Sequence, residues 1–411
     1  MESKKKDYSR RDFLTKSVSG MGVVGLLGMS EKRLALYDQE KSAQDAKKEI
    51  IQRVLGKTGI RVPVVNMGVM NSLDSALIKR SYEIGVRHFD TAASYMRGGN
   101  EKVLGNAFKE LDVRDKVIIG TKIYVPRQQR KMSPEKVKET YLRVAEESLE
   151  RLQTDYVDIL YSHNVSTLDW LNNPGILEAL RTLKKTGKAR FIGFTTHSNM
   201  AECIDEAVRT GDYDVILTAY NYAMADDQKL AASLKKAASK GIGLVAMKTQ
   251  CSQYWYRENV PSSKQPYYEG KIMHSAVLKW ALRNDVITTA VPGYTTFQQM
   301  EEDISVAHDL EYTPEEKKFL EDREVRFSLG VCRQCYRCAP TCPKGVDIPT
   351  LMRTHMYAIC YSNFSQARDA LDEIPRRKGL DACVSCETCS ANCVNRVDIG
   401  RRIDELKTIY V

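Results

Sequence analysis

The chain has 411 residues, of which 43% are hydrophobic and 8% aromatic, and it carries a formal net charge of +9. This length exceeds that of one ordinary domain and leaves room for a large domain with a small appendage. Residues 1–36 hold eight Lys and Arg against four Asp and Glu, which leaves only +5 for the other 375 residues. Because no basic stripe is interleaved with aromatics, we expect no nucleic-acid binding. Because no run of eighteen apolar residues occurs, we expect no integral membrane segment.

The first 36 residues carry an arginine pair. "SRRDFLTKS" (9–17) precedes the short, moderately apolar "VSGMGVVGLLGM" (18–29). This order resembles a twin-arginine export signal, which implies a periplasmic protein exported folded and loaded with its cofactors. The alternative is a basic tail with a small amphipathic helix. Residues 37–50 are charged and polar and predict a linker.

From about residue 53 to 310, short apolar β-rich runs alternate with amphipathic helical stretches. Between two of the runs, residues 133–152 predict a helix capped by Ser133. A doubly wound sheet is the competing fold, but its G-x-G-x-x-G signature is absent. We therefore predict an α/β fold, a (β/α)8 barrel over residues 51–325, with "GKTG" (56–59) as the turn of an N-terminal hairpin. The eight predicted strands cover residues 64–69, 88–92, 117–122, 157–163, 189–195, 215–221, 243–248 and 288–293.

Four polar residues fall at or just after the ends of consecutive predicted strands. Asp90 ends the second strand and Tyr95 follows in its loop, while Lys122 ends the third strand and His163 the fourth. In a barrel the strand ends form one mouth, so we expect the four side chains to meet there. Each residue also has a structural alternative: a loop cap, a packing residue, a solvated strand end and a core histidine.

The chemistry of the four residues is coherent. A free tyrosine has a pKa near 10, and a nearby ammonium would lower it. Asp90 can hold Lys122 charged, and His163 can position a carbonyl oxygen. The set therefore predicts carbonyl–alcohol interconversion, with Tyr95 as the proton carrier and a cofactor supplying the hydride.

The segments "GVRHFDTAASY" (85–95), "GTK" (120–122) and "DYVDILYSHN" (155–164) resemble the signatures of the aldo-keto reductase superfamily. "RVLGKTGIRVPVVNMGV" and "GGNEKVLGNAF" resemble it too, and the likeness covers roughly residues 51–320. It implies that Asp90, Tyr95, Lys122 and His163 are the catalytic residues. It also implies a small carbonyl or alcohol substrate and NADPH or NADH lying across the barrel mouth.

The cofactor-contacting positions depart from the family pattern. Where a Ser-Asn pair is common after the fifth strand, this chain has "GFTTHSN", so Thr195, Thr196 or His197 would serve. Leu217 stands where a Gln is usual, three residues before the Tyr220–Asn221 pair.

Two further departures follow the last two strands. Met247 replaces a frequent ring-stacking Tyr, while Gly293 and Gln299 replace the Lys and Arg that often bind the 2′-phosphate. NADP preference is therefore not implied. The predicted cofactor-binding residues are Thr195, Thr196, Asn221, Met247 and Gly293.

Eight of the eleven cysteines lie in two runs near the C-terminus. Both runs have the spacing C-x2-C-x2-C-x3-C, which is typical of ferredoxins that carry two [4Fe–4S] clusters. In that pattern the fourth Cys ligates the other cluster. We therefore predict crossed ligand sets, namely Cys332, Cys335, Cys338 and Cys393 for one cluster, and Cys383, Cys386, Cys389 and Cys342 for the second.

Zinc is the main alternative for the two runs, but it has no use for a third Cys at the same short spacing. Disulfides between cysteines this close would be strained. The spacer of some forty residues is helical in period, and the segment resembles the helical ferredoxin modules of multi-subunit oxidoreductases. We therefore predict a small, mostly helical dicluster domain over residues 326–411. Of the remaining cysteines, Cys360 is expected to be buried, and Cys203 and Cys251 to have no role in the chemistry.

Taken together, the sequence predicts an exported oxidoreductase with an aldo-keto reductase barrel, two clusters for electron transfer and a possible redox partner protein. The alternative is a non-catalytic electron-relay subunit whose barrel binds a partner. A nicotinamide transfers two electrons as a hydride, whereas each cluster transfers one, so the two chemistries need an intermediary.

Overall fold

The computed structural model describes residues 49–126, 129–250, 273–322, 325, 330–383, 386 and 388–411. The predicted export signal and most of the predicted linker lie outside these residues. So does most of the loop "QCSQYWYRENVPSSKQPYYEG" (250–270), in which we expect substrate specificity to reside. Residues from Ile50 to Val411 form one compact unit.

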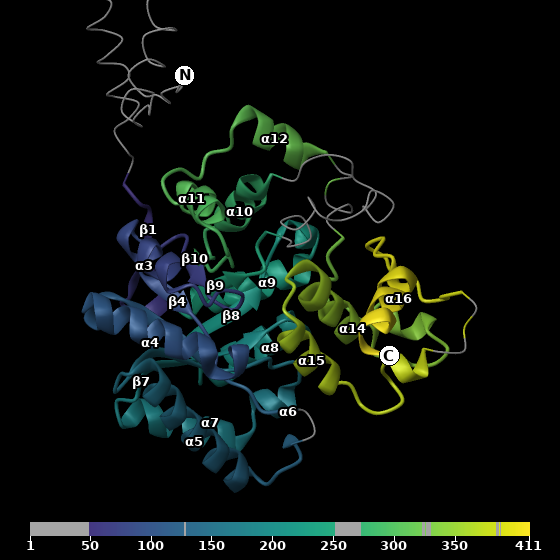
Figure 1. Ribbon diagram of the computed structural model, residues 1–411, viewed down its shortest axis with the longest axis horizontal. Coiled ribbons are helices and arrows are strands. Elements are labelled where there is room, and N and C mark those ends of the chain that lie inside the picture. The colour runs from purple at the N-terminus through teal and green to yellow at the C-terminus, as the bar shows by residue number, and fades with distance from the viewer. Residues whose placement is uncertain are drawn as a thin grey trace, which may run out of the picture. The chain divides into compact units, whose positions relative to one another are not determined.

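Eight parallel strands form a barrel (Figure 1). Their order is β10-β9-β8-β7-β6-β5-β4-β3, so each strand pairs with its neighbours in sequence. A parallel bridge between Val65 and Ala290 joins the two ends of the ladder. The predicted (β/α)8 fold is confirmed. The strands are β3 (Met67–Gly68), β4 (His88–Asp90), β5 (Ile118–Ile123), β6 (Val157–Ser162), β7 (Ala189–Thr196), β8 (Val215–Ala219), β9 (Gly243–Met247) and β10 (Thr289–Ala290).

An antiparallel hairpin precedes the barrel, as the "GKTG" turn predicts. Its strands are β1 (Gln52–Val54) and β2 (Arg61–Pro63). Gly56 in the turn has a φ of 54°, and a Cβ there would lie 2.4 Å from the carbonyl oxygen of Gly241. Because Gly241 precedes β9, the hairpin packs against the amino-terminal end of the barrel. Only glycine allows so close an approach.

Amphipathic helices surround the strands and bury their apolar faces against them. The helix predicted over 133–152 is α5, which begins after Ser133; the Ser133 side chain accepts from the Lys136 amide. The helices of this region are α3 (Ser75–Glu83), α4 (Gly99–Leu111), α5 (Pro134–Leu152), α6 (Leu168–Leu171), α7 (Pro174–Lys185), α8 (Met200–Thr210), α9 (Gln228–Ser239), α10 (His274–Leu282), α11 (Phe297–Val306) and α12 (Pro314–Glu321).

The C-terminal segment is helical, as predicted, and has a hydrophobic core of its own that includes Leu351, Ile403 and Leu406. A one-turn π-helix interrupts the spacer helices and contains Cys360, which is buried as expected. Across the described residues, no helix combines the length and apolar character needed to cross a membrane. The elements are η8 (Ala339–Thr341), α14 (Ile348–His355), the π-helix η9 (Met356–Cys360), α15 (Phe364–Asp372), η10 (Leu380–Ala382) and α16 (Ile399–Tyr410).

Candidate active site and cysteine centres

The four residues predicted to be catalytic meet at the carboxyl ends of the strands. Lys122 Nζ donates to Asp90 Oδ2 at 2.6 Å and lies 4.8 Å from the ring centroid of Tyr95. The Tyr95 and His163 rings pack edge to face with centroids 5.7 Å apart. All four side chains are buried. The barrel therefore brings together residues that are up to 73 positions apart in the sequence.

The backbone around Tyr95 is shaped to present its side chain. Tyr95 begins the 3₁₀ turn η2 (Tyr95–Gly98), in which Met96 and Arg97 have φ angles of 47° and 54°. Such left-handed conformations are costly for residues other than glycine and are often found at functional sites. On the neighbouring strand, a Cβ on Gly120 would lie 3.0 Å from His88 Nε2 and 3.2 Å from Tyr161 Cε2. The small residue leaves room for these two rings next to Asp90.

The expected lowering of the Tyr95 pKa is wrong for this structure. Burial raises the pKa of Tyr95 well above 10, and the charge of Asp90 adds to the shift. Lys122 does not offset these effects, because its ammonium is engaged by the carboxylate of Asp90. Tyr95 is therefore a protonated phenol, suited to donate a proton to a carbonyl oxygen.

His163 is neutral at this site. Burial lowers the pKa of His163 well below 6.5, and the charges of Lys122, Arg353, Arg130 and Lys248 lower it further. The Nδ1 atom of His163 has no hydrogen-bond partner within the described part of the chain. A neutral imidazole can donate a hydrogen bond to a carbonyl oxygen without transferring a net charge.

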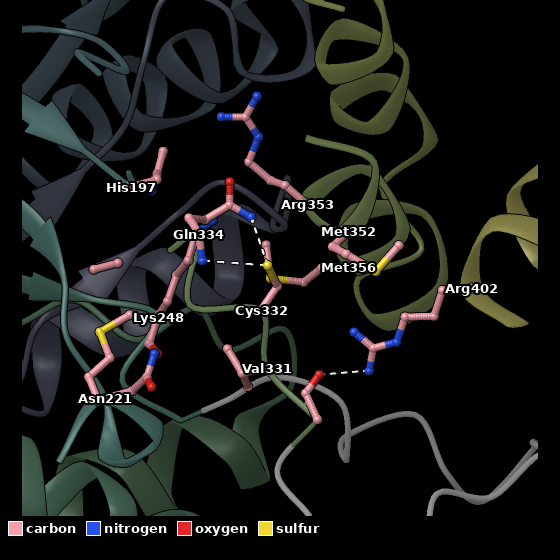
Figure 2. Close-up of a pocket in the computed structure, with 13 residues that line it drawn as sticks. His197, Asn221, Lys248, Val331, Cys332, Gln334, Met352, Arg353, Met356 and Arg402 are labelled. Carbon is pink, nitrogen blue, oxygen red and sulfur yellow. Dashed lines mark hydrogen bonds between the residues drawn. The ribbon is translucent and has the colours of Figure 1, made fainter. Parts of the chain in front are cut away.

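A pocket of about 550 Å3, including space open to solvent, lies where loops of the barrel meet the cysteine-bearing segment (Figure 2). None of Asp90, Tyr95, Lys122 and His163 is among its lining residues. His197 and Asn221 line it from the loops after β7 and β8, and Lys248 lines it from the end of β9. Cys332 and Arg353 face them from the cysteine-bearing segment. The candidate cofactor mouth of the barrel and a predicted cluster ligand therefore share one pocket.

The structure separates the five predicted cofactor residues. Asn221 lines the pocket, whereas Met247 and Gly293 are not among its lining residues. The hydroxyl of Thr195 accepts from the backbone amide of Asn164 at 2.9 Å. The hydroxyl of Thr196 donates to the backbone carbonyl of Ser198 at 2.9 Å. Both hydroxyls are thus engaged by the protein backbone, that of Thr195 by the loop after β6 and that of Thr196 by the loop after β7. Of the three candidates after β7, the pocket is lined by His197.

The helical segment contacts the barrel through polar residues that sequence reasoning missed. Asn164 directly follows His163 and donates from Nδ2 to both carboxylate oxygens of Glu373 at 3.1 Å. Arg353 donates to Asn164 Oδ1 at 3.2 Å and to Glu373 at 2.5 Å. Nothing in the local pattern of α14 signals this contact, since it depends on how α14 and α15 pack on the barrel.

None of the eight cysteines of the two runs forms a disulfide. Burial raises the pKa of Cys332 to about 12, and the charges of Cys393 and Cys338 add to it. Burial also raises the pKa of Cys338, and among the other cysteines the charge of Cys393 raises it most, then that of Cys335, then that of Cys342. Burial likewise raises the pKa of Cys383, and the charges of Cys389, Cys342 and Cys386 add to the increase. These neighbourhoods favour the crossed ligand sets, which stay a prediction.

The donor set of eight cysteine sulfurs fits two iron–sulfur clusters. Among the described residues, no three His, Cys, Asp or Glu side chains converge closely enough to hold one metal ion. A four-iron cube takes one thiolate at each of four irons, so its ligands stand further apart. Amide groups also approach the sulfurs: Gln334 Nε2 donates to Cys332 Sγ at 3.3 Å, and the Asn395 amide to Cys393 Sγ at 3.4 Å.

Comparison with known proteins agrees with this geometry. The aldo/keto reductase family profile matches residues 69–264, and that of a 4Fe-4S dicluster domain matches residues 331–398. L-galactose dehydrogenase of Arabidopsis thaliana is 30% identical over 302 residues, which cover 66% of this chain and 93% of that protein. L-glyceraldehyde 3-phosphate reductase of Escherichia coli K12 is 24% identical, over 64% of this chain and 89% of that one.

Solved structures show the same fold. An aldo-keto reductase from Bacillus halodurans in its holo form superposes with a TM-score of 0.54 at 21% identity, over 68% of this chain and 100% of that one. An aldo-keto reductase from Klebsiella pneumoniae in complex with NADPH gives 0.51 at 22% identity, over 68% and 95%. Fold and relatives together define an oxidoreductase enzyme built on a (β/α)8 barrel. The chain belongs to the aldo/keto reductase family and carries a 4Fe-4S dicluster domain at its C-terminal end.

Proposed function

We propose that the chain interconverts a small carbonyl compound and its alcohol at the barrel mouth and exchanges electrons through two [4Fe–4S] clusters. The observation that carries the proposal is the buried meeting of Tyr95, Lys122, Asp90 and His163 at the carboxyl ends of the strands. The charges of His163 and Lys122 act on His197, which lines a pocket together with Cys332. In this proposal a hydride site therefore adjoins an electron-transfer ligand in one chain.

Each residue of the site has a defined part in the reduction. Tyr95 remains protonated and donates its proton to the carbonyl oxygen as negative charge develops there. His163, held neutral, orients that oxygen by a hydrogen bond. Lys122, paired with Asp90, packs against the tyrosine ring with Nζ 4.8 Å from the ring centroid and so holds Tyr95 in place. In the oxidative direction the same tyrosine would accept the proton.

The pocket side chains would hold the carrier. A nicotinamide, when bound, supplies or accepts the hydride, and each cluster exchanges one electron. His197 and Asn221 are the residues that would hold the nicotinamide, because they line the pocket. Cys332, Cys335, Cys338 and Cys393 would hold the cluster beside it, and Cys383, Cys386, Cys389 and Cys342 the other.

The predicted twin-arginine signal makes this an exported protein in our proposal, loaded with clusters before export. A protein that works outside the cytoplasm would need a redox partner, because soluble nicotinamide is not expected there. The clusters provide the route to such a partner.

Analysis of the anaerobically purified protein tests the cluster half of the proposal. We expect about eight iron and eight sulfide atoms per chain, the content of two [4Fe–4S] clusters. Zinc in place of iron would contradict the electron-transfer role. The same sample, titrated with NADH and NADPH by fluorescence, tests whether the pocket binds a nicotinamide.

One specific observation favours the alternative of a non-catalytic relay subunit. Met247 and Gly293 lie outside the pocket lining. Gln299, whose Oε1 accepts from the Thr295 backbone amide at 2.8 Å, offers no positive charge to a phosphate. If neither nucleotide binds and no carbonyl is reduced, the barrel is a scaffold for a partner.

A further inference from the structure

Three cationic side chains line the pocket at the barrel mouth: Lys248, Arg353 and Arg402. No Asp or Glu is among the lining residues of this pocket. Arg353 comes from α14 and Arg402 from α16, whereas Lys248 directly follows the barrel strand β9. The positive charge of the pocket is therefore assembled from both parts of the chain.

The two arginines are already engaged to different extents. Arg402 donates to the Gly330 carbonyl at 2.6 Å. Arg353 is paired with Glu373 at 2.5 Å and bonded to Asn164, yet its buried Nε has no partner among the described residues. A buried guanidinium N–H without an acceptor is costly, so an acceptor is expected there.

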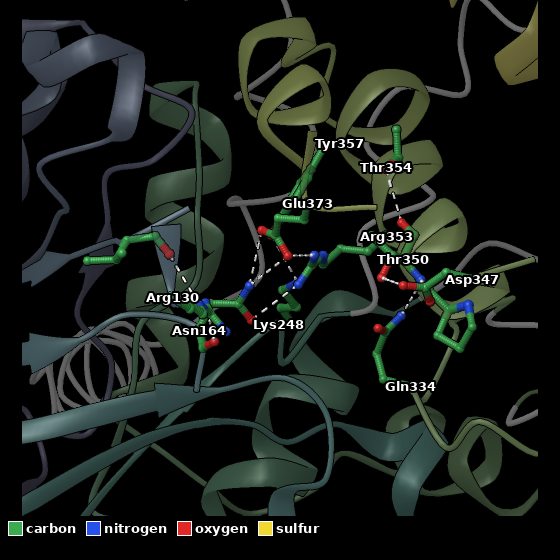
Figure 3. Close-up of polar contacts among 12 residues, drawn as sticks. Arg130, Asn164, Lys248, Gln334, Asp347, Thr350, Arg353, Thr354, Tyr357 and Glu373 are labelled. Carbon is green, nitrogen blue, oxygen red and sulfur yellow. Dashed lines mark hydrogen bonds and ion pairs between the residues drawn. The ribbon is translucent and has the colours of Figure 1, made fainter. Parts of the chain in front are cut away.

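Lys248 lacks a counter-ion. Within the described part of the chain its Nζ makes no ion pair, and its hydrogen bond is to the Tyr357 hydroxyl at 3.4 Å (Figure 3). Burial and the charge of Arg353 lower the pKa of Lys248 to about 7, against the opposing charges of Cys332 and Glu373. Its backbone φ of 57° is a strained conformation for lysine. A buried lysine with a strained backbone and no ion pair destabilises the fold, and an anionic ligand would compensate its charge.

These cations act on the proposed catalytic residues. The charges of Lys248 and Arg353 lower the pKa of both His163 and His197. Lys248 donates to the Tyr357 hydroxyl at 3.4 Å, and burial and the charge of Tyr95 raise the pKa of that hydroxyl. A ligand held by Lys248 and Arg353 would therefore share its electrostatic surroundings with His163 and Tyr95.

We propose that Lys248 and Arg353 bind a carboxylate of the substrate, so that the enzyme selects carbonyl compounds bearing an acid group. This inference rests on the proposed function, whose site it completes. The helical segment would thus supply a specificity residue, Arg353, to the barrel it adjoins.

Binding measurements test the inference without turnover. Calorimetric titration of the whole protein with 2-oxobutanoate and with its neutral amide, 2-oxobutanamide, compares two ligands that differ in charge. We expect the acid to bind more tightly than the amide. Lys248→Met should reduce the ratio of their two dissociation constants by about 10- to 100-fold, because one charge-assisted hydrogen bond to the carboxylate is lost. Lys102→Met, an exposed lysine on α4, should change nothing.

A second variant addresses Arg353, whose loss would strand Glu373. The double variant Arg353→Met with Glu373→Gln removes one positive and one negative charge together. It should weaken binding of 2-oxobutanoate, whereas Glu373→Gln alone should not. Equal binding of acid and amide by the wild type would overturn the inference. So would a Lys248→Met effect confined to NADH or NADPH affinity, or confined to the cluster potential. Absence of turnover with any carbonyl would instead overturn the proposed function.

Discussion

Lys122 and Asp90 form a buried ion pair, with Nζ and Oδ2 2.6 Å apart and side chains only 1% and 7% exposed. In this pair the Asp90 carboxylate neutralises the Lys122 charge that would otherwise stabilise a Tyr95 phenolate. Burial therefore has the largest effect on the pKa of Tyr95, which is raised, and the phenol stays protonated. The same pair links the chemistry of the site to the stability of the barrel.

The first prediction concerns pH. Because the pKa of Tyr95 is raised well above 10, the proton donor is fully present up to that range, and carbonyl reduction should not slow as pH rises from about 7 to 9. His163, whose pKa is lowered well below 6.5, should add no limb in that window. The measurement is kcat for reduction against pH. A descending limb near pH 8 would show that the tyrosine ionises early.

The second prediction concerns the buried pair. Asp90→Asn should cost about 3–5 kcal/mol in the free energy of unfolding, because Lys122 is left as an uncompensated buried charge. The double variant Asp90→Asn with Lys122→Met should recover much of that stability, yet not the catalytic rate. Glu83→Gln, which breaks the exposed Arg80–Glu83 pair, is the control and should cost at most about 0.5 kcal/mol. Equal losses from both single variants would contradict the account.

The third prediction tests the crossed ligand sets. Cys332→Ser and Cys393→Ser should both reduce the iron content from about eight to about four per chain and leave the same remaining cluster signal in electron paramagnetic resonance. Cys342→Ser should leave the other signal. Cys360→Ala, a buried thiol outside the runs, should retain both clusters. If Cys393→Ser matched Cys383→Ser instead, each run would hold its own cluster.

The fourth prediction concerns acid stability. Burial, aided by Lys122, lowers the pKa of His88 to about 3, and neither ring nitrogen has a partner among the described residues. Between pH 6.5 and 3 the unfolded chain therefore binds a proton at His88 that the folded barrel does not, so stability falls as pH falls. The slope from this residue is about 1.4 kcal/mol per pH unit.

His88→Gln should therefore flatten the dependence of the unfolding free energy on pH between about 6 and 4.5, whatever its effect at neutral pH. An unchanged slope in His88→Gln would mean that His88 is protonated in the folded barrel.

Much of this architecture is predictable from local pattern. The eight strands, the cap at Ser133 and the two cysteine runs each carry a short-range signal, and strand ends converge in any closed barrel. Arg353 and Glu373 give no such signal, since their role arises only when α14 and α15 pack against Asn164. The pKa of Tyr95 was mispredicted because burial and the competition for Lys122 depend on three-dimensional distances.

The central claim is that the barrel is catalytic through Tyr95, and turnover tests it most directly. With NADH or NADPH and a panel of small aldehydes, ketones and oxo acids, the wild type should reduce at least one carbonyl. Tyr95→Phe should lower kcat by about 100- to 10,000-fold while nucleotide binding persists. Tyr141→Phe, which loses a buried hydroxyl bonded to Ser162, should retain the rate. Equal inactivity of wild type and Tyr95→Phe, with no nicotinamide bound by either, would contradict the account.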